Sequence, residues 1–404
     1  MGDRALTPNS ALADFLRGRG DPLARAREVA RAAAPGSPEA VDARIVEASV
    51  LLCSRDARDF EAAGWVYAGL ASSSKNPLQE AHAAAIRVAV DGDYAGAVRT
   101  YDRILATRPT DALALSVAHV FDHYLGNPEA LRARSARSLA AWPAEAPDYH
   151  AVLSLHAFAL QECGDYDQAE ALARRALELE PLDLRAHHAV AHVMEMQGRF
   201  EEGVRWMGSR SAHWTGAGAA SVHLWWHLAL YHLELGQPGN ALAVLDHRMQ
   251  GESLPELIDA SALLWRLHLR GVGVALRFEA LAARWAPHAE DAHCAFNDLH
   301  AMMAFVAARR WDSSARLLAA QERRAGRPAG ANHDMTRLVG LPASRALLAF
   351  GRGDYDTAEA LLRGLPPVAH RIGGSHAQRD ILHLTRAAAA ARRFSDARHL
   401  RLVA

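Results

Sequence analysis

A short phrase that recurs along the chain restricts the possible folds more than any other feature of the sequence. Each of the five clearest copies starts with a glycine, continues with polar residues and an aromatic residue or proline, and reaches a small residue four or five positions later. Neighbouring copies begin 34 or 38 residues apart, and weaker copies occur at 310–315, 353–358 and 393–397. The glycines of the five clearest copies are Gly92, Gly126, Gly164, Gly198 and Gly236.

A period near 34 residues with glycine, an aromatic residue and alanine at fixed places is typical of the tetratricopeptide repeat, a pair of antiparallel helices. Glycine permits the positive φ of the tight turn, alanine lets two helix backbones approach, and proline follows the second helix. Apolar residues between the turns keep helical spacing, and no strand pattern is found. We therefore predict an all-α fold, a right-handed α-solenoid of about eight tetratricopeptide-like helix pairs, each buried only against its neighbours.

We expect two regions along the chain. Residues 1–60 have a helical pattern but lack the phrase, so they are predicted to form a helical N-terminal cap. Residues 61–404 are predicted to form the repeat solenoid, although 251–287 shows helical periodicity without a good turn motif. The superhelix is expected either to close around a central pocket or to remain an open arc.

The charged residues exclude several classes of chemistry. The chain has 45 Lys+Arg against 46 Asp+Glu, and Lys75 is the single lysine. Its Ser-Ser-Ser-Lys-Asn-Pro surroundings fit neither a Schiff-base lysine for pyridoxal phosphate nor a phosphate-binding loop. Because the formal net charge is −1, a general basic surface for nucleic acid is not expected either.

Cysteine usage and apolar runs bear on the compartment. Cys53, Cys163 and Cys294 are far apart and form no C-x-x-C, which argues against a disulfide framework or a thiolate zinc site. The first residues lack the apolar core of a signal peptide. No apolar run is as long as the roughly 18 residues that cross a bilayer. We therefore expect a cytoplasmic protein with no membrane partner.

The 22 histidines are concentrated at particular places in the repeats. In a tetratricopeptide-like pair, the first helix presents to the concave surface the residues about 13, 9, 6 and 2 positions before the turn, because these share one helical face. Counting back from each turn places imidazoles on or beside this stripe in most repeats. These histidines are His119, His156, His188, His192, His223, His227, His300 and His383.

Imidazoles at these places suit proton transfer or metal ligation near neutral pH. The pairs His188/His192 and His223/His227 have the i, i+4 spacing that lets two imidazoles bind one metal ion, although no strict H-E-x-x-H is present. A divalent metal is therefore an open possibility, and the simpler interpretation is a polar inner face that binds peptides. The candidate metal ligands are His188, His192, His223, His227 and His300.

Several runs of the sequence resemble the tetratricopeptide repeat protein 38 family, also called StaR-like. They lie at 188–196, 223–227, 296–300, 339–342 and 373–380, and none belongs to the generic repeat consensus. The resemblance covers residues 64–390 and implies a set of shared positions. These are His119, Glu162, His188, His192, Glu195, His223, Trp226, His227, Asp259, Arg266, Asn297, Asp298, His300, Arg337, Gln378, Arg379 and Asp380.

The positions selected by repeat register and by resemblance largely coincide, and they predict a small-molecule site on the concave face. We expect an enzyme that acts on a small anionic or amino-acid-like molecule by general acid–base chemistry, with metal assistance left open. His192 and His227 are predicted to be the leading acid–base or ligand pair, and His300 the third candidate. No G-x-G-x-x-G follows a strand, so a Rossmann-type flavin or nucleotide site is not expected.

The remaining catalytic candidates have auxiliary roles. Glu195 or Asp298 would orient an imidazole, and Asn297 would donate to a developing oxyanion. Arg379 would bind a carboxylate through both of its terminal nitrogens. The predicted substrate-binding residues are His119, Glu162, His188, His223, Trp226, Asp259, Arg266, Arg337, Gln378, Arg379 and Asp380.

Two other functions fit the same sequence. An interaction scaffold would hold a peptide or protein partner in its groove, with the histidines as satisfied polar residues. A metal or haem carrier would need the ligands but no oriented surroundings. A closed superhelix with a pocket favours the enzyme, and an open groove favours the scaffold.

Overall fold

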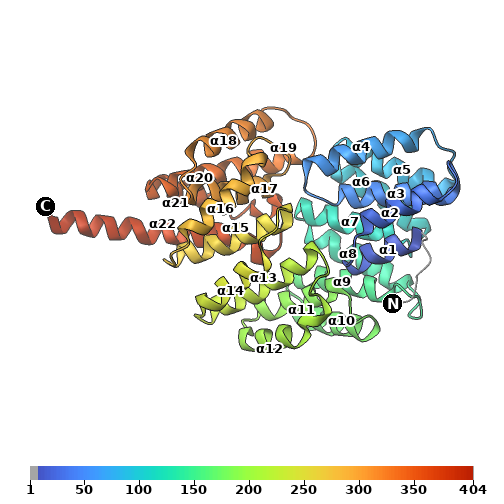
Figure 1. The fold of residues 1–404 in the computed structure, drawn as a ribbon, viewed down its shortest axis with the longest axis horizontal. Coiled ribbons are helices and arrows are strands. Elements are labelled where there is room, and N and C mark those ends of the chain that lie inside the picture. Colours follow the sequence, from blue (N-terminus) through green and yellow to red (C-terminus); the bar gives the residue numbers. More distant parts are fainter. Residues whose placement is uncertain (1–7, 404) are drawn as a thin grey trace. The chain divides into compact units, whose positions relative to one another are not determined.

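The computed structural model describes residues 8–403, and within that range it contains helices but no strand. The chain divides into two compact units, Met1–Leu224 and Trp225–Ala404. In each unit, successive helices run back and forth as antiparallel pairs (Figure 1). The predicted all-α fold of tetratricopeptide-like helix pairs is therefore confirmed. The first residues, considered above for a signal peptide, lie outside the described range.

The helices of the first unit are α1 (Pro8–Arg17), α2 (Pro22–Ala32), α3 (Pro38–Leu52), α4 (Ala57–Ala71), α5 (Pro77–Val90), α6 (Tyr94–Thr107), α7 (Ala112–Leu125), α8 (Pro128–Ala141), α9 (Tyr149–Glu162), α10 (Tyr166–Leu179), α11 (Leu184–Met196) and α12 (Phe200–Arg210), then a 3-10 turn (Ser211–His213). Three of them, α7, α9 and α11, carry histidines that were placed on or beside the concave stripe. Helix α13 (Ala219–Glu234) is continuous across the boundary between the units.

The second unit continues the series. Its helices are α14 (Pro238–Arg248), α15 (Leu254–Leu269), α16 (Ala275–Trp285), α17 (Ala295–Ala307), α18 (Trp311–Ala325), α19 (Ala331–Met335), α20 (Leu341–Gly351), α21 (Tyr355–Arg363) and α22 (His376–Val403), with 3-10 turns at Ala286–His288 and Ala369–Ile372 and a π-helical turn at Thr336–Gly340.

The repeated phrase forms the turn inside each helix pair. Between α9 and α10, Gly164 has a φ of +82°, its amide donates to the carbonyl of Gln161, and the amide of Asp165 donates to that of Leu160. This is the Schellman arrangement, in which glycine takes the left-handed conformation. Ala169 is fully buried at the start of α10, so the small residue of the phrase lets the two helices approach. Helix α9 also packs against α8, α11 and α7, as a stacked repeat requires.

Helix pairs also form where the sequence lacks the phrase. Helices α1 to α4 pack in succession, and α15 packs against α16 within 251–287. The missed turn signal in that segment is Gly271, which follows α15 with a φ of +79°. Its amide donates to the carbonyl of His268, and the amide of Val272 donates to that of Leu267. The turn is therefore the same as in the other repeats, but the polar and aromatic residues of the phrase are absent.

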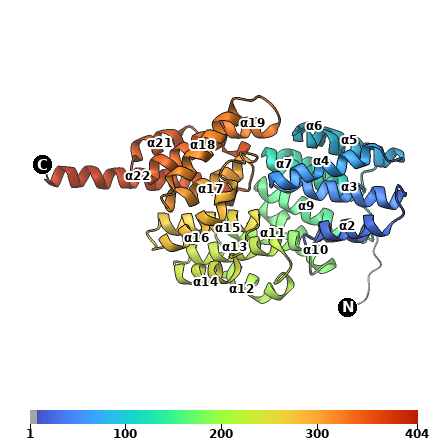
Figure 2. The same cartoon turned by 45° about the horizontal axis from the view of Figure 1, so that its top comes forward.

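Two weaker copies of the phrase have different outcomes. Between α17 and α18, Arg309 takes the glycine position with a φ of +54°, and the amide of Arg310 donates to the carbonyl of Phe305. The copy at 393–397 was predicted to make a turn, and this is wrong, because α22 runs through it without interruption (Figure 2). That copy contains no glycine, and Ser and Asp alone do not end a helix.

Each unit has its own core. In the first unit, Tyr101 and Phe121 are fully buried among the aliphatic side chains of α3 to α9. In the second, the indole nitrogens of Trp265 and Trp285 donate to the hydroxyls of Thr385 and Ser261, both at 2.9 Å. Among the described helices, none combines the length and apolar character needed to span a membrane.

Candidate functional site

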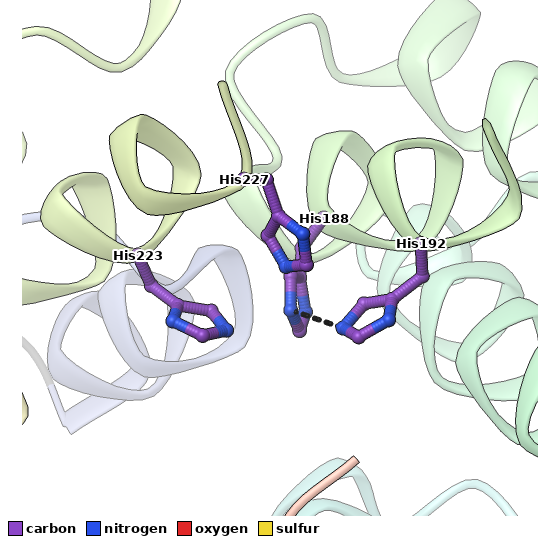
Figure 3. Close-up of side chains that lie close together, drawn as sticks. All are labelled: His188, His192, His223 and His227. Carbon is purple, nitrogen blue, oxygen red and sulfur yellow. Dashed lines mark hydrogen bonds between the residues drawn. The ribbon is translucent and has the colours of Figure 1, made fainter. Parts of the chain in front are cut away.

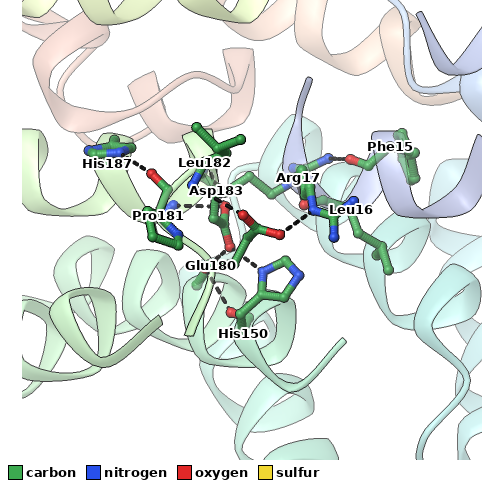
Figure 4. A network of polar contacts seen from close by, with 12 residues as sticks. Phe15, Leu16, Arg17, His150, Glu180, Pro181, Leu182, Asp183 and His187 are labelled. Atoms are coloured by element: carbon green, nitrogen blue, oxygen red, sulfur yellow. Dashed lines mark hydrogen bonds and ion pairs between the residues drawn. The ribbon is translucent and has the colours of Figure 1, made fainter. Parts of the chain in front are cut away.

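A buried carboxylate fixes the start of α11, the helix that carries His188 and His192. Asp183 is fully buried and caps α11 by accepting from the backbone amides of Arg185 (2.9 Å) and Ala186 (3.1 Å). The same carboxylate accepts from His150 Nδ1 at 2.7 Å and from Ser154 Oγ at 2.6 Å (Figure 4). Since His150 and Ser154 belong to α9, one residue joins the two helices and sets where α11 begins.

The N-terminal helix is tied to the same end of α11. The guanidinium of Arg185 donates to the carbonyl oxygens of Phe15 (3.0 Å) and Leu16 (3.1 Å), the last turn of α1, and lies 5.3 Å from the centre of the Phe15 ring. Arg17 forms an ion pair with Glu180 at 2.7 Å (Figure 4). Burial lowers the pKa of Arg185 from its ordinary value. A cation at the carbonyl end of a helix is favourable, so α1 partly compensates for this burial.

Four imidazoles converge where α11 faces α13. One ring nitrogen from each of His188, His192, His223 and His227 lies within 4.8 Å of the other three (Figure 3). His192 and His227 are fully buried, whereas His188 and His223 are half-buried. Because His223 and His227 are one turn apart on the continuous helix α13, their relative position follows from helix geometry.

The two imidazoles of α11 are in direct contact. Their Nε2 atoms lie 2.8 Å apart and the ring centres 4.4 Å apart. In this hydrogen bond one Nε2 donates and the other accepts, so the two neutral rings hold opposite tautomers. The ring of His223 approaches that of His188 at 4.9 Å between centres. The sequence-predicted metal ligands on α11 and α13 are therefore brought together.

An aromatic ring that the sequence analysis did not single out lies against this group. Phe158 of α9 stacks on His188, with the ring centres 5.5 Å apart and the planes inclined by 19°. Its edge contacts are with His192 at 5.6 Å, His119 at 5.8 Å and His123 at 5.4 Å. The signal was available, because Phe158 and His123 precede their turn glycines by 6 and 3 residues, on or beside the concave stripe.

The other predicted residues of the first unit lie on the same row of helices. His119 of α7 is buried, and burial together with the charge of Arg185 holds its pKa well below the usual value. Glu162, one turn after Phe158 on α9, is buried and accepts from the side-chain amide of its neighbour Gln161 at 2.9 Å. Glu195 is half-buried near the end of α11.

In the second unit, Asp298 packs between the two helices of a pair. It lies on α17, is buried, and accepts from the side-chain amide of Gln321 on α18 at 3.3 Å. Burial raises its pKa from 3.8 to about 7. Asp298 thus faces the partner helix α18, where it would hold a proton up to neutral pH.

The arginine predicted to bind substrate on α15 connects helices. Arg266 is buried, forms an ion pair with Asp380 of α22, and donates to the carbonyl oxygens of Ala262 (3.0 Å) and Ala377 (2.5 Å). Its guanidinium lies 5.3 Å from the ring centre of Trp226, which is fully buried. The structure therefore brings Arg266, Asp380 and Trp226 together as a packed group within the second unit.

Two more predicted residues shape the start of α22. The side-chain oxygen of Gln378 accepts from the amide of Ser375 at 3.0 Å, which is half of a capping box. Arg379 donates to the carbonyl of Gly374. The Ser375-x-x-Gln378 spacing is a helix-start signal that the sequence analysis overlooked.

The last predicted residues have separate surroundings. Arg337 is exposed in the π-helical turn and forms an ion pair with Asp334 at 3.2 Å. His300 is buried on α17, and its Nδ1 donates to the carbonyl of Phe296 at 2.7 Å, which leaves the lone pair of the neutral ring on Nε2. The carboxamide and carboxylate of Asn297 and Asp259 are buried on α17 and α15.

Comparison with known proteins adds little to this geometry. No protein-family model matches the chain. Among solved structures, a crystal structure of the APC/C hetero-tetramer Cut9-Hcn1 matches at 13% identity with a TM-score of 0.39, covering 85% of this chain and 63% of that chain. The chain therefore spans less than two thirds of the length of the structure that it matches.

Proposed function

We propose that this protein binds a divalent transition-metal ion at the histidine cluster and uses it in acid–base chemistry on a small molecule that carries a carboxylate. The observation that carries the proposal is the convergence of four imidazole nitrogens within 4.8 Å, from His188, His192, His223 and His227. Imidazole is the ligand of zinc, copper, nickel and iron ions, whereas magnesium and calcium prefer oxygen.

The spacing of the two nitrogens on α11 is close to what one ion requires. Two nitrogens bound at about 2.0–2.1 Å to one ion lie roughly 2.9 Å apart at a right angle and roughly 3.3 Å apart at a tetrahedral angle. The Nε2 atoms of His188 and His192 lie 2.8 Å apart. Binding of an ion would replace their hydrogen bond with two metal bonds if the donor ring carried its proton on Nδ1 in place of Nε2 and the rings turned toward the ion. A bound ion would supply Lewis acidity at neutral pH.

The arginine content of the chain supports a small acidic substrate. The chain draws nearly all of its positive charge from arginine, whose guanidinium group recognises carboxylates through a fixed fork of donors. We also infer that the chain belongs to the tetratricopeptide repeat protein 38 family, on the runs at 188–196 and 223–227. Residues 1–60 would cap the solenoid.

A protein-interaction scaffold is the second candidate, because stacked helix pairs with a polar inner face serve peptide binding.

The test begins with metal content. Protein purified without a histidine tag or chelator should contain close to one equivalent of a transition metal, and the His188→Ala/His192→Ala double variant should contain far less. Metal-loaded protein is then incubated with a set of N-acetyl amino acids, and the acetate released by hydrolysis is measured with and without chelator. A wild-type protein that holds no metal and takes up none at micromolar concentration would leave the scaffold as the better candidate.

A further inference from the structure

Phe158 lies between two pairs of histidines from different helices. On one side are His119 and His123 of α7, and on the other are His188 and His192 of α11, with all four ring centres 5.4–5.8 Å from the phenyl centre. All five residues belong to the first unit. Because α9 packs against both α7 and α11, this one phenyl ring contacts a pair of imidazoles on each of the two neighbouring helices.

The contacts differ in kind on the two sides. Phe158 is nearly parallel to His188, at 19°, and meets His192, His119 and His123 edge-on, at 84°, 61° and 74°. A stacked neighbour restricts rotation of the His188 ring about its χ2 bond, and an edge contact restricts that of His192. Both rings of α11 are thus oriented by an apolar side chain, and their nitrogens are directed toward each other and toward α13.

A metal centre bordered by six imidazoles would behave differently from one bordered by four. Ions of this class accept four to six ligands, and catalysis needs a position that the protein does not fill. His119 and His123 are outside the group of converging nitrogens. The side chain that stands between them and α11 is the phenyl ring of Phe158.

We propose that Phe158 is a positioning residue of the metal centre: it orients His188 and His192 and keeps His119 and His123 out of the coordination sphere. This rests on the proposed metal site and adds the reason why its donor set is limited to α11 and α13. The limit leaves room for a substrate carboxylate or water on the ion.

The test uses the full chain loaded with one equivalent of Cu²⁺, with bound imidazoles counted by pulsed electron paramagnetic resonance. Phe158→Ala should add at least one imidazole to the wild-type count, and the Phe158→Ala/His119→Ala/His123→Ala variant should lose this gain. Phe158→Leu, which keeps most of the volume but not the stack, should shift the Cu²⁺ spectrum and weaken binding roughly 10- to 100-fold. Phe121→Leu is the matched control, because Phe121 is a buried phenyl of α7 whose ring contacts are with Tyr94 and Tyr101.

The outcomes are distinguishable. If the wild type binds Cu²⁺ through His192 while both Phe158 variants keep the wild-type spectrum and affinity, the role of Phe158 is overturned and the metal site stands. If the wild type binds no Cu²⁺, or His192→Ala does not alter the spectrum, the metal site itself fails. Should Phe158→Ala not fold, the spectrum and affinity of Phe158→Leu decide the question.

Discussion

The Nε2 atoms of His188 and His192 lie 2.8 Å apart on successive turns of α11. Neutral rings at this distance share a hydrogen bond, and in the proposed metal site the same two nitrogens bind one ion. The protein should therefore gain stability from a bound ion in proportion to the logarithm of its concentration. At one hundred times the dissociation constant the gain is about 2.7 kcal/mol. We expect Zn²⁺ to raise the melting temperature of the wild type measurably and that of His192→Ala hardly at all.

A surface histidine gives the control for this first prediction. His247 is exposed on α14, and His247→Ala should retain the full Zn²⁺ response. An equal rise in melting temperature for His192→Ala and the wild type would contradict the assignment of His192 as a ligand.

Replacing Asp183 should destabilise the first unit strongly. Asp183→Ala removes the cap of α11 and leaves His150 and Ser154 without their buried acceptor, which together costs about 3 kcal/mol or more. Urea denaturation followed by circular dichroism measures the loss. Asp165 occupies the same cap position of α10 but is exposed and makes no side-chain cap hydrogen bond, so Asp165→Ala should change stability by less than about 0.5 kcal/mol. Equal losses in the two variants would refute the special role of Asp183.

Arg309 should be replaceable by glycine with a gain in stability. A side chain at φ +54° costs roughly 1 kcal/mol relative to glycine, partly offset by the greater freedom of glycine in the unfolded chain. We expect Arg309→Gly to raise the free energy of unfolding by a few tenths of a kcal/mol to about 1 kcal/mol. The reverse exchange, Gly164→Ala, should lower it by about 1 kcal/mol, because the added methyl group meets no neighbour and only the backbone is strained. The same sign for both variants would rule out backbone strain as the cause.

Asp298 should make stability depend on pH between about 4 and 7. Its pKa is raised by burial to about 7 in the folded chain, above the ordinary 3.8, so the folded state binds more protons than the unfolded state in this window. The stabilisation is complete below about pH 4 and is lost as the pH rises to about 7. As the pH increases, the free energy of unfolding of the wild type should therefore fall relative to that of Asp298→Asn. The exposed Asp312 is the control, since Asp312→Asn should give a flat difference, and a flat profile for Asp298→Asn as well would contradict the prediction.

The fold was predictable because its signals are local. A glycine such as Gly164 selects a left-handed turn by its own chemistry, and alanines such as Ala169 mark where two helices touch, so the repeat appears in the sequence as a period. The turn at Arg309 was indicated only by the weaker copy at 310–315, which has no glycine, and the turn at Gly271 was missed because the rest of the phrase is absent. The continuity of α22 shows the opposite error, in which part of the phrase occurs without the glycine.

The candidate site was only half predictable. Helical periodicity places His188 and His192 on one face of α11, and this needs no knowledge of other helices. The contact with Phe158 requires knowing the order in which helices stack. Asp298 was predicted to orient an imidazole, but its carboxylate accepts from Gln321 of α18, a contact that depends on how α17 and α18 pack.

The contacts between α1 and the start of α11 have a consequence for how the first unit folds. Solenoids ordinarily hold only contacts between neighbouring repeats, so they can unravel from an end. Here Arg17 meets Glu180 across 163 residues, Arg185 meets Phe15 across 170, and Arg19 reaches the carbonyl of His213 across 194. Such distant pairings raise the contact order and slow folding, yet they join the first repeat to the sixth. The first unit should therefore melt in one cooperative step, and no fraying repeat at its N-terminus should be detected by hydrogen exchange.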